Sequence, residues 1–135
     1  ASPRAPVILL DTSVWIDVFR RHRPLDLEAV VDLEEVVTCW PVVQEVLQGF
    51  RDEGAFRVAR DALLNLPIVE DPLAGATFHL AVDLYRACRR QGLTVRSSID
   101  CLIAASALRH DLEVVHRDRD YDLLAKVSPL RARRI

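Results

Sequence analysis

The chain has 135 residues, half of them hydrophobic and 28% charged, with 20 acidic against 18 basic side chains. A chain of this length forms one domain, which buries about two-thirds of its unfolded surface without needing disulfides or a structural metal. The composition excludes a disordered chain, and its apolar runs fall far short of the ~20 residues of a membrane span. The net charge of −2 argues against a strongly basic nucleic-acid coat.

The cysteines and the first residues bear on where the protein works. Cys39, Cys88 and Cys101 lie in apolar contexts without a C-x-x-C pair, which favours reduced core cysteines over a disulfide or metal framework. Residues 1–6 contain no apolar signal-peptide core. We therefore expect a cytoplasmic protein without a membrane partner, in which residues 1–6 form a disordered tail.

Apolar patterns predict alternating strands and helices along the rest of the chain. The β-branched run at residues 7–10 is typical of a strand buried on both faces, and Asp11 follows it as a helix cap. Gly92 is expected to end the longest helix. The predicted strands are 7–10, 36–39, 67–69, 113–116 and a terminal strand after 127, and the predicted helices are 14–20, 26–35, 41–49, 53–66, 74–91, 98–110 and 121–127. This alternation predicts a single α/β domain over residues 7–135, with a mainly parallel central sheet flanked by helices.

Several common sites are excluded by their motifs. The sequence contains no phosphate-binding glycine loop, no dinucleotide fingerprint, no H-E-x-x-H and no G-x-S-x-G. The stretch that begins at Asp118 starts like a calcium loop, but Leu123 and Pro129 occupy its required glycine and glutamate positions. Ser13 stands where an aspartyl-nucleophile phosphatase needs a second aspartate after Asp11.

What remains is a set of carboxylates at the ends of predicted elements. Binding sites in parallel sheets collect at the carboxyl ends of the strands, where Asp11 and Asp118 follow two of them. Carboxylates clustered without bases raise one another's pKa unless a cation lies between them, and their hard oxygens suit Mg²⁺ or Mn²⁺. We therefore hypothesise a metal-dependent phosphodiesterase. The full set is Asp11, Glu45, Asp100, Asp118 and Asp120.

Each acid also has a purely structural interpretation. Asp11 can cap the first helix, and Asp100 lies in a first helical turn at capping-box spacing. Glu45 lies away from the apolar stripe of its helix, which is typical of a solvated surface residue. Asp118 and Asp120 belong to a charged stretch for which an exposed ion-pair loop is the default. Spacing alone leaves these alternatives open.

Four short segments carry a family resemblance across residues 7–127. They read ILLDTSVWID at 8–17, PVVQEVLQG at 41–49, SIDCLIAA at 98–105 and HRDRDYD at 116–122. Each is weak alone, but in this order and at these separations they resemble the PIN-domain ribonucleases, specifically the VapC-type toxins of bacterial toxin–antitoxin pairs. Tyr121 departs from the family pattern, in which phenylalanine is commoner at this place.

The resemblance implies a catalytic site and its metal. Asp11, Glu45, Asp100 and Asp118 match the four acids that line the site of such domains. Asp11, Asp100, Asp118 and the additional acid Asp120 are the implied metal ligands, with Glu45 as a further ligand or a water-orienting base. The implied cofactor is Mg²⁺ or Mn²⁺, and the implied chemistry is metal-assisted hydrolysis of RNA.

Other residues are assigned supporting roles. Thr12 or Ser13 matches a polar neighbour that helps to hold a carboxylate or a water. Arg96, Arg117 and Arg119 lie beside the acid-bearing segments, and our hypothesis is that they hold RNA phosphates. Arg89 and Arg90 precede Arg96 in the same segment, and for these two a solvated arginine face is the alternative.

The resemblance also implies partners. Similar proteins pair as homodimers and are held inactive by a VapB-like antitoxin whose C-terminal segment covers the site. We therefore predict a metal-dependent endoribonuclease toxin of a type II system, with an RNA substrate and a toxin–antitoxin hetero-oligomer. A housekeeping PIN nuclease without an antitoxin and a non-catalytic RNA- or protein-binding module remain as alternatives. The short single-domain chain argues against the former and the intact acid set against the latter.

Overall fold

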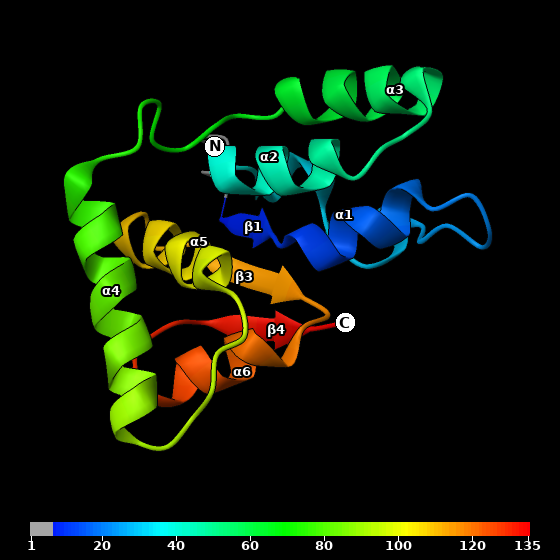
Figure 1. Ribbon diagram of the computed structural model, residues 1–135. Helices are drawn as coiled ribbons and strands as arrows, with labels where there is room; N and C mark the ends of the chain where they lie inside the picture. Colours follow the sequence, from blue (N-terminus) through cyan, green and yellow to red (C-terminus); the bar gives the residue numbers. More distant parts are fainter. Residues whose placement is uncertain (1–6) are drawn as a thin grey trace, which may run out of the picture.

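Residues 7–135, the part of the chain that the computed structural model describes, contain four strands and six α-helices, with four of the helices in succession between the second and the third strand (Figure 1). The expected disordered tail at 1–6 lies outside the described residues. The strands are β1 (Ile8–Leu10), β2 (Val36–Val37), β3 (Glu113–His116) and β4 (Ala132–Arg134). The helices are α1 (Thr12–Phe19), α2 (Trp40–Gln48), α3 (Glu53–Leu64), α4 (Gly75–Arg90), α5 (Ser98–Arg109) and α6 (Arg119–Lys126). None of these helices is long and apolar enough to cross a membrane.

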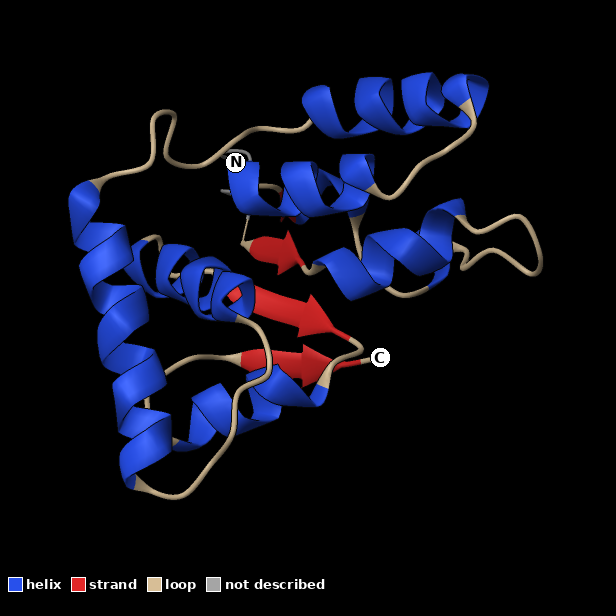
Figure 2. Cartoon of the chain, in the orientation of Figure 1, coloured by secondary structure: helices blue, strands red, loops and turns tan. Residues whose placement is uncertain are grey.

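The four strands form one sheet in the order β2-β1-β3-β4, and every pairing is parallel. In the centre, Ile8 pairs with Glu113 and Leu10 with Val115. Figure 2 shows the strands pointing the same way, with helices around them. The predicted α/β domain with a parallel sheet is confirmed. Its main consequence is that the segments after β1 and β3 begin side by side at one edge of the sheet.

The helices form two groups around this sheet. Figure 1 shows α1 to α3 on one side of it and α4 to α6 on the other, with α4 packed along α5. Helix α5 is buried from Asp100 to Ala107, and its alanines let neighbouring elements approach closely. Gly92 follows α4 with a φ of 72°, a backbone conformation that suits glycine and ends the helix as predicted.

Two predicted elements are wrong. The helix expected at 26–35 is replaced by two single-turn 3₁₀ helices, Leu27–Ala29 and Leu33–Glu35. Asp32 lies between them, and its side chain accepts a hydrogen bond from Glu34 N, which starts a new turn and interrupts the first. The strand expected at 67–69 is reduced to one parallel bridge between Ile68 and Thr38.

The fold depends on the apolar contacts of the central strand. Leu9 is fully buried in β1 between its two neighbours. We expect Leu9→Ala to lower the free energy of unfolding by about 2–5 kcal/mol, because it removes buried methyl groups and leaves a cavity. Urea titration followed by circular dichroism measures this change. The control Val58→Ala, at a side chain 66% exposed on α3, should stay within about 0.5 kcal/mol of wild type; equal effects would contradict the assigned core.

Candidate functional site

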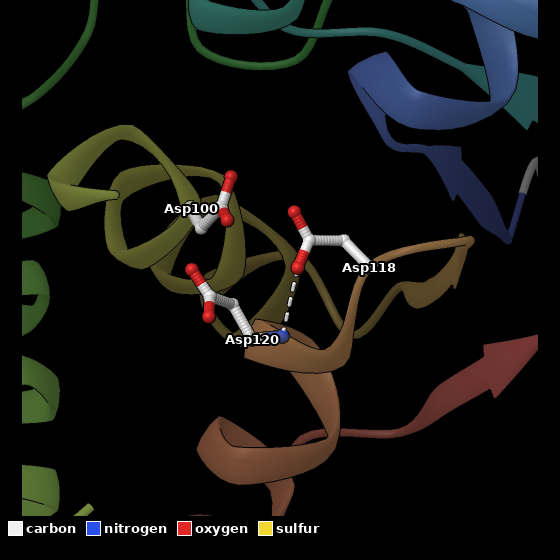
Figure 3. Close-up of side chains that lie close together, drawn as sticks. All are labelled: Asp100, Asp118 and Asp120. Atoms are coloured by element: carbon white, nitrogen blue, oxygen red, sulfur yellow. Dashed lines mark hydrogen bonds between the residues drawn. The ribbon is translucent and has the colours of Figure 1, made fainter. Parts of the chain in front are cut away.

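Three carboxylates meet beside the carboxyl end of β3. Asp100, Asp118 and Asp120 each offer one oxygen, and these oxygens lie within 4.8 Å of one another (Figure 3). Asp100 comes from the first turn of α5, whereas Asp118 and Asp120 come from the start of α6. The structure thus brings together three of the predicted acids from two segments, and we call them the acid cluster.

Backbone amides hold two members of the acid cluster in place. Asp118 caps α6, because its Oδ1 accepts a hydrogen bond of 2.9 Å from Asp120 N. Asp120 Oδ2 accepts from Arg96 N at 3.0 Å and Ser97 N at 3.3 Å, which ties the segment before α5 to α6. Asp120 is only 1% exposed. The interpretation of this stretch as a solvated ion-pair loop is therefore wrong for Asp120.

Asp11 lies beside the acid cluster, at the end of the other central strand. It is buried at the end of β1, and its Oδ2 accepts hydrogen bonds from the amide and hydroxyl of Ser13. Its Oδ1 accepts from the hydroxyl of Tyr121, and the same hydroxyl oxygen lies 3.3 Å from Asp100 Oδ1. Ser13 Oγ in turn accepts from Arg117 N at 3.0 Å. Asp11 is thus both a helix cap and a neighbour of Asp100, so the two interpretations of its role coexist.

Glu45 reaches the site from α2. Its Oε1 accepts a hydrogen bond of 2.8 Å from the hydroxyl of Thr12. The side chain is half-buried, and burial raises its pKa above the ordinary value, an effect to which the charges of Asp11 and Asp118 add. The expectation of a solvated surface glutamate is therefore wrong. Thr12 and Ser13, both predicted as supporting residues, each bind a different carboxylate.

Sequence reasoning missed the role of Tyr121. Its side chain is fully buried, and its hydroxyl lies between Asp11 and Asp100. Its ring packs against His116, with the ring centroids 5.2 Å apart. A buried tyrosine normally finds a partner for its hydroxyl, and this rule was the available signal. An apolar phenylalanine at the same place would lack that bond.

The acid cluster carries unbalanced negative charge. Asp100 is 5% exposed, and burial, followed by the charge of Asp11 and interactions with Asp120 and Asp118, raises its pKa to about 8. Asp100 Oδ2 and Asp120 Oδ1 are buried and receive no hydrogen bond from the described part of the chain. Buried carboxylate oxygens of this kind are the hard ligands that Mg²⁺ and Mn²⁺ prefer, so the residues fit such a cation.

The three candidate arginines have different surroundings. Arg96 Nη2 lies 3.4 Å from Asp118 Oδ1 and its Nε lies 3.7 Å from Asp120 Oδ1, on a side chain that is 60% exposed. Arg117 instead forms an ion pair of 2.6 Å with Asp17. Arg119 is exposed and makes no hydrogen bond or ion pair within residues 7–135.

Removal of the Tyr121 hydroxyl should destabilise the protein. We expect Tyr121→Phe to lower the free energy of unfolding by about 1–3 kcal/mol, because a buried carboxylate of Asp11 loses a donor. Chemical denaturation measures the change. Tyr85→Phe is the matched control, since that ring is 40% exposed and its hydroxyl has no hydrogen bond among the described residues. If the two variants differ by less than the error of the titration, the bond contributes nothing.

Stability should also depend on the proton of Asp100. The folded pKa of about 8 exceeds the ordinary 3.8, so between these values the folded state binds a proton that the unfolded state has released. Linkage then requires that the contribution of Asp100 to stability falls as pH rises through this window. With a chelator present, we expect the thermal midpoint of Asp100→Asn to exceed that of wild type by a difference that grows from pH 4 to pH 8. A difference that is constant over this range would contradict the assignment.

Comparisons with known proteins agree with this arrangement. Residues 8–127 match the family model described as PIN domain. Ribonuclease VapC11 of Mycobacterium tuberculosis is 39% identical over 133 residues, which cover 93% of this chain and 97% of the relative. Ribonuclease VapC51 of the same organism is 33% identical over 123 residues, which cover 89% of this chain and 86% of the relative.

Solved structures share the fold. The DNA-bound VapBC from Salmonella typhimurium matches with a TM-score of 0.78 at 17% identity, covering 95% of this chain and 97% of the other. VapBC-5 from Mycobacterium tuberculosis matches with a TM-score of 0.72 at 22% identity, covering 96% and 100%. At these identities the likeness concerns the fold alone. The family match and the curated relatives together show that the chain belongs to the PIN-domain family and, within it, to the VapC ribonucleases.

Proposed function

We propose that this protein is a divalent-metal-dependent endoribonuclease, the toxin of a type II toxin–antitoxin pair, with residues 7–135 as its one nuclease domain. The observation that carries the proposal is the buried acid cluster, in which carboxylate oxygens of Asp100 and Asp120 lack donors. RNA as the substrate follows from the ribonuclease names of its relatives. The proposal places the protein in the cytoplasm, where RNA and antitoxin are available.

The proposed cofactor is Mg²⁺ or Mn²⁺. Asp100, Asp118 and Asp120 would hold it, with Asp11 as the fourth ligand beside Asp100. Their oxygens match the hard donors that these ions prefer. Burial, and after it the neighbouring carboxylates, raise the pKa of Asp100, and a bound cation would offset both effects. When bound, such an ion polarises a phosphoryl oxygen, lowers the pKa of a water and offsets the charge that develops on the phosphate.

The chain's own residues supply orientation and proton transfer. Ser13 and Tyr121 fix both oxygens of Asp11, so this carboxylate cannot rotate freely. Glu45, held by Thr12, has a raised pKa and is a stronger base than an ordinary carboxylate. In the proposed hydrolysis Glu45 orients a water and accepts its proton as the water adds to phosphorus. The bond to the 3′ oxygen breaks, and that oxygen keeps the electron pair and takes a proton from solvent, which leaves a 5′-phosphate and a 3′-hydroxyl.

Arginines beside the acids are proposed to hold the RNA backbone. Arg119 has no partner within the described residues, so its guanidinium is available to a phosphate. The pairs of Arg96 with Asp118 and Asp120 are long and exposed to solvent, which makes them weak. Arg117 is already bound to Asp17, so it would have to break this ion pair before it could bind a phosphate.

A groove between α1 and α2 is the proposed binding site of the antitoxin. It has a volume of about 280 Å³ and is lined by apolar residues that include Phe19 and Phe50, with Ile16 55% exposed. Glu45 forms part of the same wall. An apolar segment of a VapB-like antitoxin bound here would lie against one of the proposed catalytic acids, which explains how binding would silence the enzyme.

A second apolar groove suits a homodimer. It lies between α4 and α5, has a volume of about 410 Å³, and includes Phe78, Val82 and Tyr85, which are 49%, 56% and 40% exposed. Exposed apolar patches of this kind are characteristic of interfaces. We propose that two copies of the chain associate through this face and that the antitoxin adds to them to form a hetero-oligomer.

Cleavage of structured RNA tests the proposed function. With total RNA and Mn²⁺ or Mg²⁺, we expect discrete cuts that disappear in EDTA. Asp100→Asn should slow cleavage at least about a hundredfold, because it removes a ligand and disturbs its neighbours. Asp83→Asn is the control for charge, since Asp83 is exposed on α4, and it should cleave normally.

Two outcomes would contradict the proposal. Cleavage by Asp100→Asn at the wild-type rate at saturating Mn²⁺ would remove the acid cluster from the reaction. A folded wild-type protein that binds metal and RNA without cutting would identify a binding module.

A further inference from the structure

Residues 20–23 form an exposed basic turn directly after α1. The turn consists of Arg20, Arg21, His22 and Arg23, and all four are exposed. Such a run stands out in a chain whose net charge is −2. None of the residues assigned above to metal binding, catalysis or RNA binding belongs to this turn.

The shape of the basic turn is fixed by Arg20. Its Nε donates a hydrogen bond of 2.7 Å to the carbonyl oxygen of Arg23, and its Nη1 forms an ion pair of 3.3 Å with Asp17. Arg23 has a φ of 49°, a left-handed conformation that arginine rarely adopts. The side chains of Arg21 and Arg23 themselves make no hydrogen bond or ion pair among the described residues.

The basic turn is physically connected to the acid cluster. Asp17, which binds Arg20, also binds Arg117 Nη1 at 2.6 Å, and Arg117 directly precedes Asp118. The turn and Asp11 lie at opposite ends of α1, whose eight residues span roughly 12 Å. Figure 1 shows the turn projecting on the side of the molecule toward which the strands point. A phosphate backbone that leaves the acid cluster along α1 would therefore reach it.

We propose that the basic turn is a second RNA-binding site, in which Arg21 and Arg23 hold backbone phosphates several nucleotides from the cleaved bond. This inference rests on the proposed function. A guanidinium group can donate two parallel hydrogen bonds to two oxygens of one phosphate. Because the backbone of the turn is already fixed, little conformational entropy is lost when RNA binds. The substrate class follows: an RNA that extends at least roughly 12 Å from the cut, such as a stem-loop, is bound better than a short oligonucleotide.

The test removes the two free charges and keeps the turn. Arg23→Asn suits the left-handed backbone and Arg21→Gln preserves size, so the double variant should fold normally. The control Arg57→Gln/Arg86→Gln has the same net charge. Arg57 is exposed on α3 and Arg86 on α4, and neither makes a hydrogen bond or ion pair among the described residues. The probes are a labelled stem-loop RNA that the wild-type protein cleaves and a short oligoribonucleotide with the same cleaved bond.

The expected result separates binding from chemistry. For the stem-loop RNA, the double variant should raise KM roughly tenfold with kcat unchanged, and the slope of log affinity against log salt should fall by about 1 per arginine. Cleavage of the short oligonucleotide should equal that of wild type and control. Thermal midpoints close to that of the wild-type protein would show that both variants are folded.

Other outcomes overturn the inference. Wild-type KM and salt slope in the double variant would remove the basic turn from RNA binding. Unchanged RNA binding with weakened binding of an acidic antitoxin peptide would assign the turn to a protein partner. If the wild-type protein does not cleave total RNA, no stem-loop substrate can be chosen and the proposed function itself fails, and that result differs from the first two.

Discussion

Carboxylates buried without neutralising bases are the constraint on which this structure depends. Backbone amides and hydroxyls orient them: Ser13 and Tyr121 hold Asp11, and the amides of Arg96 and Ser97 hold Asp120. These donors fix direction but supply no positive charge. The nearest guanidinium, that of Arg96, is largely exposed and its pairs are screened by water. The edge of the sheet therefore remains anionic and suited to a cation.

The packing of the rest of the fold offsets the electrostatic cost of burying carboxylates at the carboxyl end of the sheet. Helix α5 carries Asp100 on its first turn and is otherwise apolar or small through Ala107, so the carboxylate is fixed at the mouth of a tightly packed helix. Strand β1 places Asp11 beside β3 through direct parallel pairing. Rigid elements of this kind preserve an electrostatically unfavourable arrangement, which is a general property of functional sites.

Local patterns predicted the elements well where one period dominated. The helices at α2 to α5 and the strands β1 and β3 lie where apolar spacing indicated. The failure at 26–35 had a local cause, since Asp32 caps a new turn in the middle of the expected helix. For α5, the capping-box spacing was misleading: Ser97 caps the helix without a side-chain hydrogen bond, and Asp100 faces the other acids. An acid three residues after a serine can cap a helix or bind a metal, so the sequence could not tell these two roles of Asp100 apart.

The sequence by itself determined most of the strands and helices, the acids at their ends and the family, because each of these depends on neighbours in the chain or on short motifs. Tertiary structure decided which acids meet. Tyr121 binds Asp11 across 110 positions, and Thr12 binds Glu45 across 33. The ion pair between Asp17 and Arg117, which links the helix before the basic turn to the acid-bearing segment, is equally non-local. Periodicity records which face of an element is apolar, whereas only packing decides what that face, or a polar side chain beside it, will contact.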